Sequence, residues 1–217
     1  MDFLVGFSKN IVISTAQGRL SKSQYLKKEY GTLDFSEAFA GASLLKVNNE
    51  MIRREVVVIP KGDKTAIVYI RDSKTTNNRI PKEITVHEEV LIVGLNTTTK
   101  SFEVKTRIYP MDGFSPVCSD TPCSTDSDCP DRSSEGLFFP SCGENNCKTC
   151  SNWDYACVYK YGIEIAACAS SCLGCSNWSP SCLFCLVCAL DYLSSSLYAE
   201  CCRGEVVSAC HYYEWWD

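Results

Sequence analysis

Residues 55–71 read EVVVIPKGDKTAIVYIR, the clearest secondary-structure signal in the chain. Two runs rich in Val and Ile flank the turn residues Pro60-Lys61-Gly62-Asp63, a pattern typical of antiparallel strands joined by a turn. Similar runs follow the Asn77-Asn78 turn and the polar turn over 96–100. We therefore expect an antiparallel meander of four strands, at Glu55–Ile59, Ala66–Arg71, Ile84–Leu95 and Ser101–Tyr109.

One helix is expected to pack against a face of this meander. Over residues 34–48, four apolar residues recur at the spacing of a single helical face: Phe35, Phe39, Ala42 and Leu45. Asp34 or Ser36 can cap the N-terminus of that helix. The first part of the chain is therefore predicted to be a β-rich domain with one helix.

Cysteine usage and charge divide the 217-residue chain into parts. All 16 cysteines lie after residue 117. Residues 1–110 contain 17 Lys+Arg and 12 Asp+Glu, a net charge of +5, whereas residues 111–217 contain 4 and 14, a net charge of −10. We expect a basic domain over 1–110, a Pro-, Ser- and Asp-rich linker over 111–146, and a cysteine-rich cassette over 147–217. Their opposite charges would allow the first part to bind and mask the third.

A repeated motif predicts helices in the cassette. Residues 147–157 and 172–182 both read C-x-x-C-S-N-W-x-x-x-C. At 100° per residue, all six cysteines from Cys147 to Cys175 fall within an arc of about 80° on a helix. They include both CxxC pairs. Ser179-Pro180 can start a second helix that ends near Gly204, and a short third helix is expected through Val206–His211. The expected fold class is therefore α+β, with a small disulfide-rich α-helical bundle at the C-terminus.

The cysteines themselves are the candidate site residues. A cassette this short cannot rely on its apolar core alone, which favours disulfides. Zinc is the alternative, since Cys147-x2-Cys150 and Cys172-x2-Cys175 have the spacing of a four-cysteine site, and a mixture of both also remains open. The pairing cannot be deduced from sequence. The disulfide candidates are Cys118, Cys123, Cys129, Cys142, Cys147, Cys150, Cys157, Cys168, Cys172, Cys175, Cys182, Cys185, Cys188, Cys201, Cys202 and Cys210.

No catalytic constellation is visible in the sequence. A Cys/His nucleophile pair would need one of only two histidines, His87 and His211, to meet a cysteine across the two halves. His87 beside Glu88 and Glu89 could be read as a metal site, but a lone histidine on a strand is more often structural. We expect no cofactor, and no nucleic-acid partner because the basic residues are interleaved with acidic ones. The C-terminal run over 211–217, HYYEWWD, suits either an interface or a cap on a small core.

From Cys147 to Cys210 an opening CxxC is followed by cysteines at helical spacing among small and aliphatic residues, as in Ile165-Ala-Ala-Cys168-Ala-Ser-Ser-Cys172-Leu-Gly. This pattern resembles the microhalocin family, the stable archaeal antimicrobial peptides of the C-type halocin group. The resemblance implies an exported precursor that is cleaved. It also implies that the C-terminal peptide kills competing cells and that the N-terminal part confers immunity by binding it.

The leading hypothesis is a bacteriocin-like precursor that is cut within about 130–146 and is not an enzyme. Its expected partners are its own N-terminal domain and a surface or membrane component of a target cell. We expect the protein to be secreted or at the cell surface, although the segment from Met1 lacks a recognisable signal peptide. The explanation that we favour is a true start upstream of Met1; the alternatives are unconventional export and cysteines that are not all in disulfides. Two alternatives are an uncleaved secreted or surface interaction protein with a rigid cysteine-rich module, and an intracellular zinc-binding protein.

Overall fold

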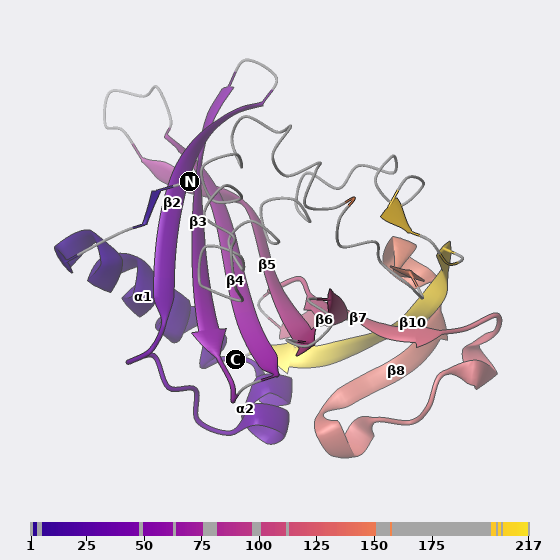
Figure 1. Cartoon of the computed structure of the whole chain (residues 1–217). Helices are drawn as coiled ribbons and strands as arrows, with labels where there is room; N and C mark the ends of the chain where they lie inside the picture. Colours follow the sequence, from indigo (N-terminus) through magenta and orange to yellow (C-terminus); the bar gives the residue numbers. More distant parts are fainter. Residues whose placement is uncertain are drawn as a thin grey trace.

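The computed structural model describes residues 2–3, 6–47, 50–62, 64–75, 82–96, 101–111, 113–150, 157, 201–202, 204 and 206–216. The described strands form one antiparallel sheet in the order β1-β2-β3-β4-β5-β6-β7-β10-β8, with β9 paired to β10 (Figure 1). Their bounds are β1 Asp2–Phe3, β2 Phe39–Val47, β3 Glu50–Pro60, β4 Thr65–Thr75, β5 Glu83–Asn96, β6 Ser101–Ile108, β7 Gly113–Pro122, β8 Leu137–Cys142, β9 Lys148–Cys150 and β10 Val206–Trp216. Short 3-10 helices lie at Asp126–Asp128, Ser133–Glu135 and Glu144–Asn146.

The antiparallel pairing of the four expected strands is confirmed. The expected ranges fall in β3, β4, β5 and β6, except that Tyr109 follows the end of β6, and each strand pairs with the next along the chain. The run 56–59 is buried on both faces of the sheet: Val57 and Ile59 belong to the core shared with the helices, whereas Val56 and Val58 lie on the other face and are equally buried. A strand buried on both faces reads as a continuous apolar run, which is why this signal is clear in the sequence.

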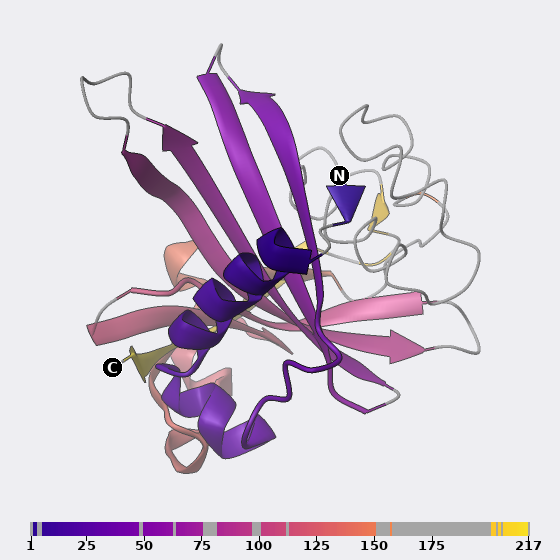
Figure 2. The ribbon, with the colours of Figure 1, turned by 90° about the vertical axis from the view of Figure 1, so that its left-hand side faces the viewer.

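Two helices precede the meander, and both lie on the same face of the sheet (Figure 2). Helix α1 spans Gly6–Leu20 and α2 spans Gln24–Tyr30. Val12, Ala16 and Leu20 recur every four residues of α1 and are buried against the sheet. In α2 the Ser23 hydroxyl caps the helix by accepting a hydrogen bond from the Leu26 N–H at 3.0 Å.

The expected helix over 34–48 is wrong. Residues 39–47 form strand β2 instead, paired along its length with β3. The Asp34 carboxylate does accept a hydrogen bond from the Ser36 N–H at 2.8 Å, but it stabilises only a short turn. The apolar residues taken for a helical face are also compatible with a strand, and pairing with the buried β3 decides the outcome.

The expected fold class, an α+β chain with a C-terminal helical bundle, is also wrong: the protein is mostly antiparallel β-sheet. The predicted third helix, Val206–His211, lies in strand β10, which pairs with β7, β8 and β9. Cys147 and Cys150 stand just before and at the end of β9 rather than on a helical stripe. The predicted second helix, from Ser179 to near Gly204, lies outside the described residues except at Cys201, Cys202 and Gly204.

The stretch 111–146, expected to be a linker, contributes two strands to the sheet. β7 pairs with both β6 and β10, and β8 pairs with β10. β10 therefore lies inside the sheet, between strands formed far earlier in the sequence (Figure 1). One sheet thus continues from the basic half of the chain to its C-terminus.

Candidate binding surface

Ten of the sixteen cysteines lie among the described residues, and all ten form disulfides. The pairs are Cys118–Cys147, Cys123–Cys142, Cys129–Cys210, Cys150–Cys202 and Cys157–Cys201. The other six candidates lie outside the described residues: Cys168, Cys172, Cys175, Cys182, Cys185 and Cys188. The disulfide interpretation of a cysteine-rich protein is therefore confirmed for the described part of the chain.

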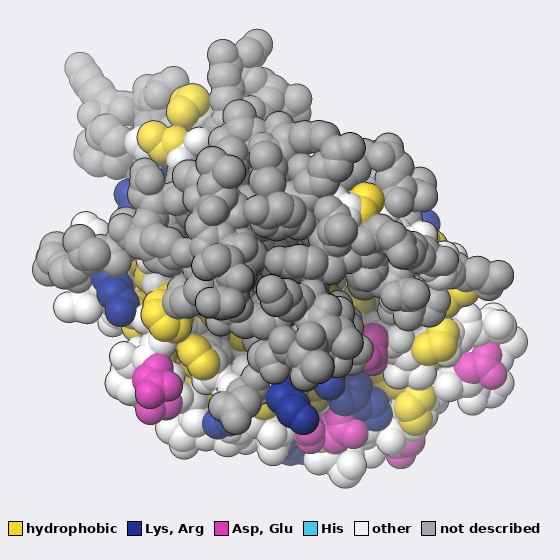
Figure 3. All heavy atoms as spheres, in the orientation of Figure 1, with side chains coloured by type: hydrophobic (Ala, Val, Ile, Leu, Met, Phe, Trp, Pro, Cys, Tyr) yellow, Lys and Arg dark blue, Asp and Glu magenta, His cyan; other side chains and the backbone are white. Residues whose placement is uncertain are grey.

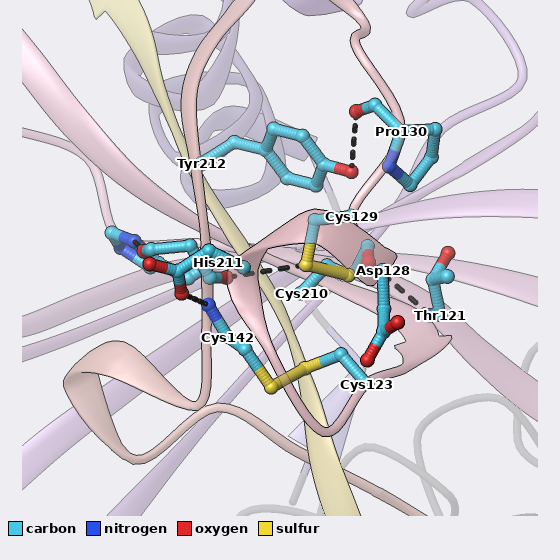
Figure 4. Close-up of a disulfide and its surroundings, with 12 residues drawn as sticks. Thr121, Cys123, Asp128, Cys129, Pro130, Cys142, Cys210, His211 and Tyr212 are labelled. Atoms are coloured by element: carbon cyan, nitrogen blue, oxygen red, sulfur yellow. Dashed lines mark hydrogen bonds between the residues drawn. A yellow bond between two sulfur atoms is a disulfide. The ribbon is translucent and has the colours of Figure 1, made fainter.

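The disulfides fix the strands that follow β6. The pairs 123–142 and 129–210 lie close together, and the Sγ atoms of Cys123, Cys129 and Cys210 are all within 4.8 Å of one another (Figure 4). Beside them, the Tyr212 hydroxyl donates a hydrogen bond to the Pro130 carbonyl at 3.1 Å. With sequence separations of 19 to 81, each loop closure contributes about 3 to 4.5 kcal/mol in the chain-entropy model.

The structure separates the residues that the sequence suggested for metal sites. Cys147 and Cys150 of the zinc alternative bond to different partners, and Cys172 and Cys175 lie outside the described residues. In β5, His87 and Glu89 share one face, and His87 Nε2 lies 3.8 Å from Glu89 Oε1. The hydrogen bond to Glu89 raises the pKa of His87. Glu88 points to the other face and accepts a hydrogen bond from the Tyr69 hydroxyl at 2.6 Å. These three residues therefore do not form a common site.

An exposed cluster of aromatic side chains lies on the outer face of β7, β8 and β10, opposite the helices. We call it the aromatic surface, and its members are Phe114, Phe138, Phe139, Tyr213 and Trp215. Ring centroids lie 4.9 Å apart for Phe114 and Trp215, 5.9 Å for Phe114 and Phe139, and 6.5 Å for Phe139 and Tyr213. The first two pairs meet edge to face, the geometry that aromatic rings favour.

The alternation of β10 creates this surface. Tyr212 and Trp216 point toward the helices and are buried, whereas Tyr213 and Trp215 point outward. On the neighbouring strands, Phe114 of β7 pairs with Trp215, and Phe138 of β8 pairs with Tyr213. The expected role as a cap on the core is confirmed for Tyr212 and Trp216, whereas the alternate rings, Tyr213 and Trp215, lie on the outer face, and their role in an interface stays a prediction.

The aromatic rings are unusually accessible for their size. The exposed fraction is 65% for Phe139, 47% for Phe114, 43% for Trp215 and 36% for Phe138. Phe139 also has a φ angle of 55°, in the left-handed region that a bulky residue rarely adopts. Such a backbone costs about 1–2 kcal/mol and, like an exposed apolar cluster, is typical of a functional site.

A polar cluster borders the aromatic surface at the end of β8. The buried His211 ring meets the Tyr213 ring edge to face at 4.7 Å. Asn145 Nδ2 donates to His211 Nε2 at 2.8 Å, so the imidazole proton lies on Nδ1, which faces Ser141 Oγ at 3.3 Å and Glu144 Oε2 at 3.4 Å. Burial lowers the pKa of His211. The ring is therefore neutral near pH 7 and acts as a rigid support for Tyr213.

The inner face of β10 is tied to helix α2 by a buried carboxyl group. Glu214 Oε2 accepts hydrogen bonds from Ser23 Oγ at 2.6 Å and from the Tyr25 N–H at 3.0 Å. Burial raises the pKa of Glu214 to about 7. The same face carries two cation–π contacts, with Arg19 5.7 Å from the Trp216 ring and Arg132 5.7 Å from the Tyr212 ring. These contacts hold β10 in position beneath the aromatic surface.

A hollow with a volume of about 350 Å³ lies between α1, α2 and the loop after α2. Among the described residues, Lys27 is its only charged lining residue, and Gln17, Ser21 and Thr32 are its other polar ones, so no described carboxylate, histidine or cysteine lines it. Its lining residues are Gln17, Leu20, Ser21, Lys27, Gly31, Thr32, Leu33 and Phe35.

Sequence reasoning missed three members of the aromatic surface, Phe114, Phe138 and Phe139. No local pattern marks them, because they meet only when β7 and β8 flank β10. Comparisons with protein-family models, with curated proteins and with solved structures give no match. Inferences about function therefore rest on the geometry of the aromatic surface and on the disulfide framework.

Proposed function

We propose that the protein acts uncleaved, as a disulfide-stabilised interaction protein that binds another protein through the aromatic surface. The observation that carries this proposal is the position of β10 inside the sheet, where its own outward rings complete the surface. Exposed aromatic side chains on a rigid support are typical of the energetic centres of protein interfaces. The disulfides add rigidity to the part of the sheet that carries these rings, beside the core beneath β10.

The disulfide topology argues against release of the cassette by proteolysis alone. A cut anywhere within 130–146 leaves Cys118 and Cys129 on one fragment and Cys147 and Cys210 on the other. At least two disulfides would still join the fragments, and a cut before Cys142 would leave Cys123–Cys142 as a third. β10 would also still pair with β7. Release of an antimicrobial peptide therefore requires reduction of all the linking bonds and withdrawal of a central strand, and that hypothesis stays a prediction.

Charge favours a protein as the partner. The half of the chain that carries the surface has a net charge of −10, which repels phosphate backbones and anionic lipids. On the face shown in Figure 3, the described Lys and Arg side chains lie among Asp and Glu side chains rather than in one basic patch. Interfacial membrane helices also depend on Lys and Arg beside their aromatic residues.

We place the mature protein in an oxidising compartment or at the cell surface. Five disulfides among the described cysteines are typical of proteins that fold outside a reducing cytosol. No helix of the described residues is long and apolar enough to cross a membrane.

Site-specific photocrosslinking in the source organism tests this proposal. A photoreactive phenylalanine replaces Phe139, which is 65% exposed, and a matched control replaces Leu44, which is 68% exposed on β2. We expect a crosslinked protein adduct from position 139 only, carrying the full-length chain. Adducts of equal yield from both positions, or none from either, would refute the proposal. So would an intact mass, measured without reduction, that shows only residues from the cassette.

A further inference from the structure

We infer that the partner presents arginine or lysine side chains to the aromatic surface, so that the protein recognises a cationic protein segment. This inference rests on the proposed function and names the chemistry of the partner. It depends on three features of the described residues: the charge around the rings, the geometry of the rings, and the contacts that the same strand already makes with arginine.

The segment that carries β7, β8 and the loops between them is acidic. Residues 113–150 contain six Asp and Glu residues against two basic residues, Arg132 and Lys148, a net charge of −4. Arg132 is committed to an ion pair with Glu135, donating to its Oε2 at 2.6 Å. The remaining carboxylates include Asp126, Asp128, Asp131 and Glu144. Their field attracts cations and repels anionic ligands.

One of these carboxylates stands at the edge of the rings. The Glu144 side chain is 53% exposed, and its Oε2 lies 3.4 Å from Nδ1 of His211, which contacts the Tyr213 ring. A cation above Tyr213 would therefore lie near both a ring face and a carboxylate. Hydrogen bonds from neighbouring backbone N–H groups lower the pKa of Asp128 and Asp131, so both remain ionised well below pH 7.

The ring geometry suits cation–π contacts. Phe114 meets Trp215 at an interplanar angle of 79° and Phe139 at 68°. Phe139 is 65% exposed, so a cation from a partner can reach its ring. A guanidinium or ammonium group is attracted to the face of an aromatic ring within about 6 Å of the ring centroid.

The inner face of β10 shows the same recognition within the chain. There Arg19 lies 5.7 Å from the Trp216 ring, and Arg132 lies 5.7 Å from the Tyr212 ring. Two aromatic residues of this strand, four positions apart, thus each accept a guanidinium. The outward rings of Tyr213 and Trp215 are two positions apart, so guanidinium groups from a partner would meet them at the closer spacing of alternate residues in a strand. An extended cationic segment would bring alternate side chains to one face at nearly that spacing.

Selection from a random peptide display library tests the inference. The full oxidised chain is the bait, and the variant F114S/F139N, which removes two exposed rings, is the counter-bait. The matched control, L44S/M51S, removes two exposed apolar side chains from the β2–β3 hairpin, 68% and 55% exposed. Unreduced mass and circular dichroism confirm that each bait is folded and fully crosslinked.

We expect the selected peptides to be rich in Arg and Lys, to bind the control as well as the wild type, and to lose binding to F114S/F139N. Replacing one contacting arginine by its neutral isostere citrulline should weaken binding about 2- to 30-fold. Binding should also weaken as salt rises.

The possible failures are distinct. Peptides that require the aromatic surface but are neutral or acidic would overturn this inference and leave the proposed function standing. If the wild-type chain selects no peptide that distinguishes it from F114S/F139N, both the inference and the proposed function fail. Self-association of the chain that F114S/F139N abolishes would also overturn the inference, because a second copy would then be the occupant.

Discussion

Replacing Glu214 by Gln should remove the pH dependence that the Glu214 carboxyl contributes to the free energy of unfolding. The side chain is fully buried at the junction of β10 and α2, and burial raises its pKa from 4.5 to about 7. The folded state therefore holds the proton more tightly than the unfolded state. Stability from this group is complete below about pH 4.5 and is lost as pH rises toward 7. The difference corresponds to about 3 kcal/mol.

Urea unfolding of the oxidised protein at pH 5 and pH 8 measures this effect. We expect the free energy of unfolding of E214Q minus that of wild type to be about 2.5 kcal/mol higher at pH 8 than at pH 5, because only the wild type loses stability over this range. The titrations of His87 and His211 cancel in this comparison because both proteins contain them. Glu29→Gln on the exposed face of α2 is the control and should follow wild type. Parallel pH profiles for E214Q and wild type would refute the reasoning.

Three further results are expected. Asp72→Ala leaves the buried Arg54 guanidinium without the carboxylate that binds it at 2.6 and 2.8 Å. Urea titrations should show a free energy of unfolding that is lower by about 3 kcal/mol. A loss under about 1 kcal/mol would contradict the assigned burial. Phe139→Gly removes a bulky residue from a φ of 55° and should raise the free energy of unfolding by about 1 kcal/mol while abolishing binding of the selected cationic peptides. Destabilisation would show that the ring packs into the fold. The double variant C129A/C210A opens a loop of 81 residues, and its free energy of unfolding should fall by about 4 kcal/mol. The fall should be smaller for C123A/C142A, whose cysteines are 19 residues apart, and the opposite order would argue against the pairing.

The meander could be predicted because its signal is local. Residues 55–59 and 66–71 are apolar runs beside a turn, and consecutive antiparallel strands need no information from elsewhere in the chain. Helix α1 was missed because Ile11 and Ile13 stand among its core residues and blur the helical period. The turn after Asp34 resembled a helix start, and only the pairing of β2 with β3 shows otherwise.

The C-terminal error has a different cause. Cysteines three or four residues apart suit a helical stripe, but the same spacing also serves disulfides to separate partners. In a strand, residues three apart point to opposite faces, and Cys147 and Cys150 accordingly bond to Cys118 and Cys202. The run VVSACHYYEWW over 206–216 did carry a strand signal in its β-branched and aromatic residues. Its pairing with β7 spans too many residues to be read from sequence.

The account depends most on the claim that β10 and the disulfides keep the two halves of the chain together. The direct measurement is to insert a specific protease site within the exposed 3-10 helix Ser133–Glu135, cut the oxidised chain there, and determine its mass with and without reduction. We expect a single species with the mass of the whole chain plus one water before reduction, and two fragments after it. Separation of the fragments without a reductant would contradict the account.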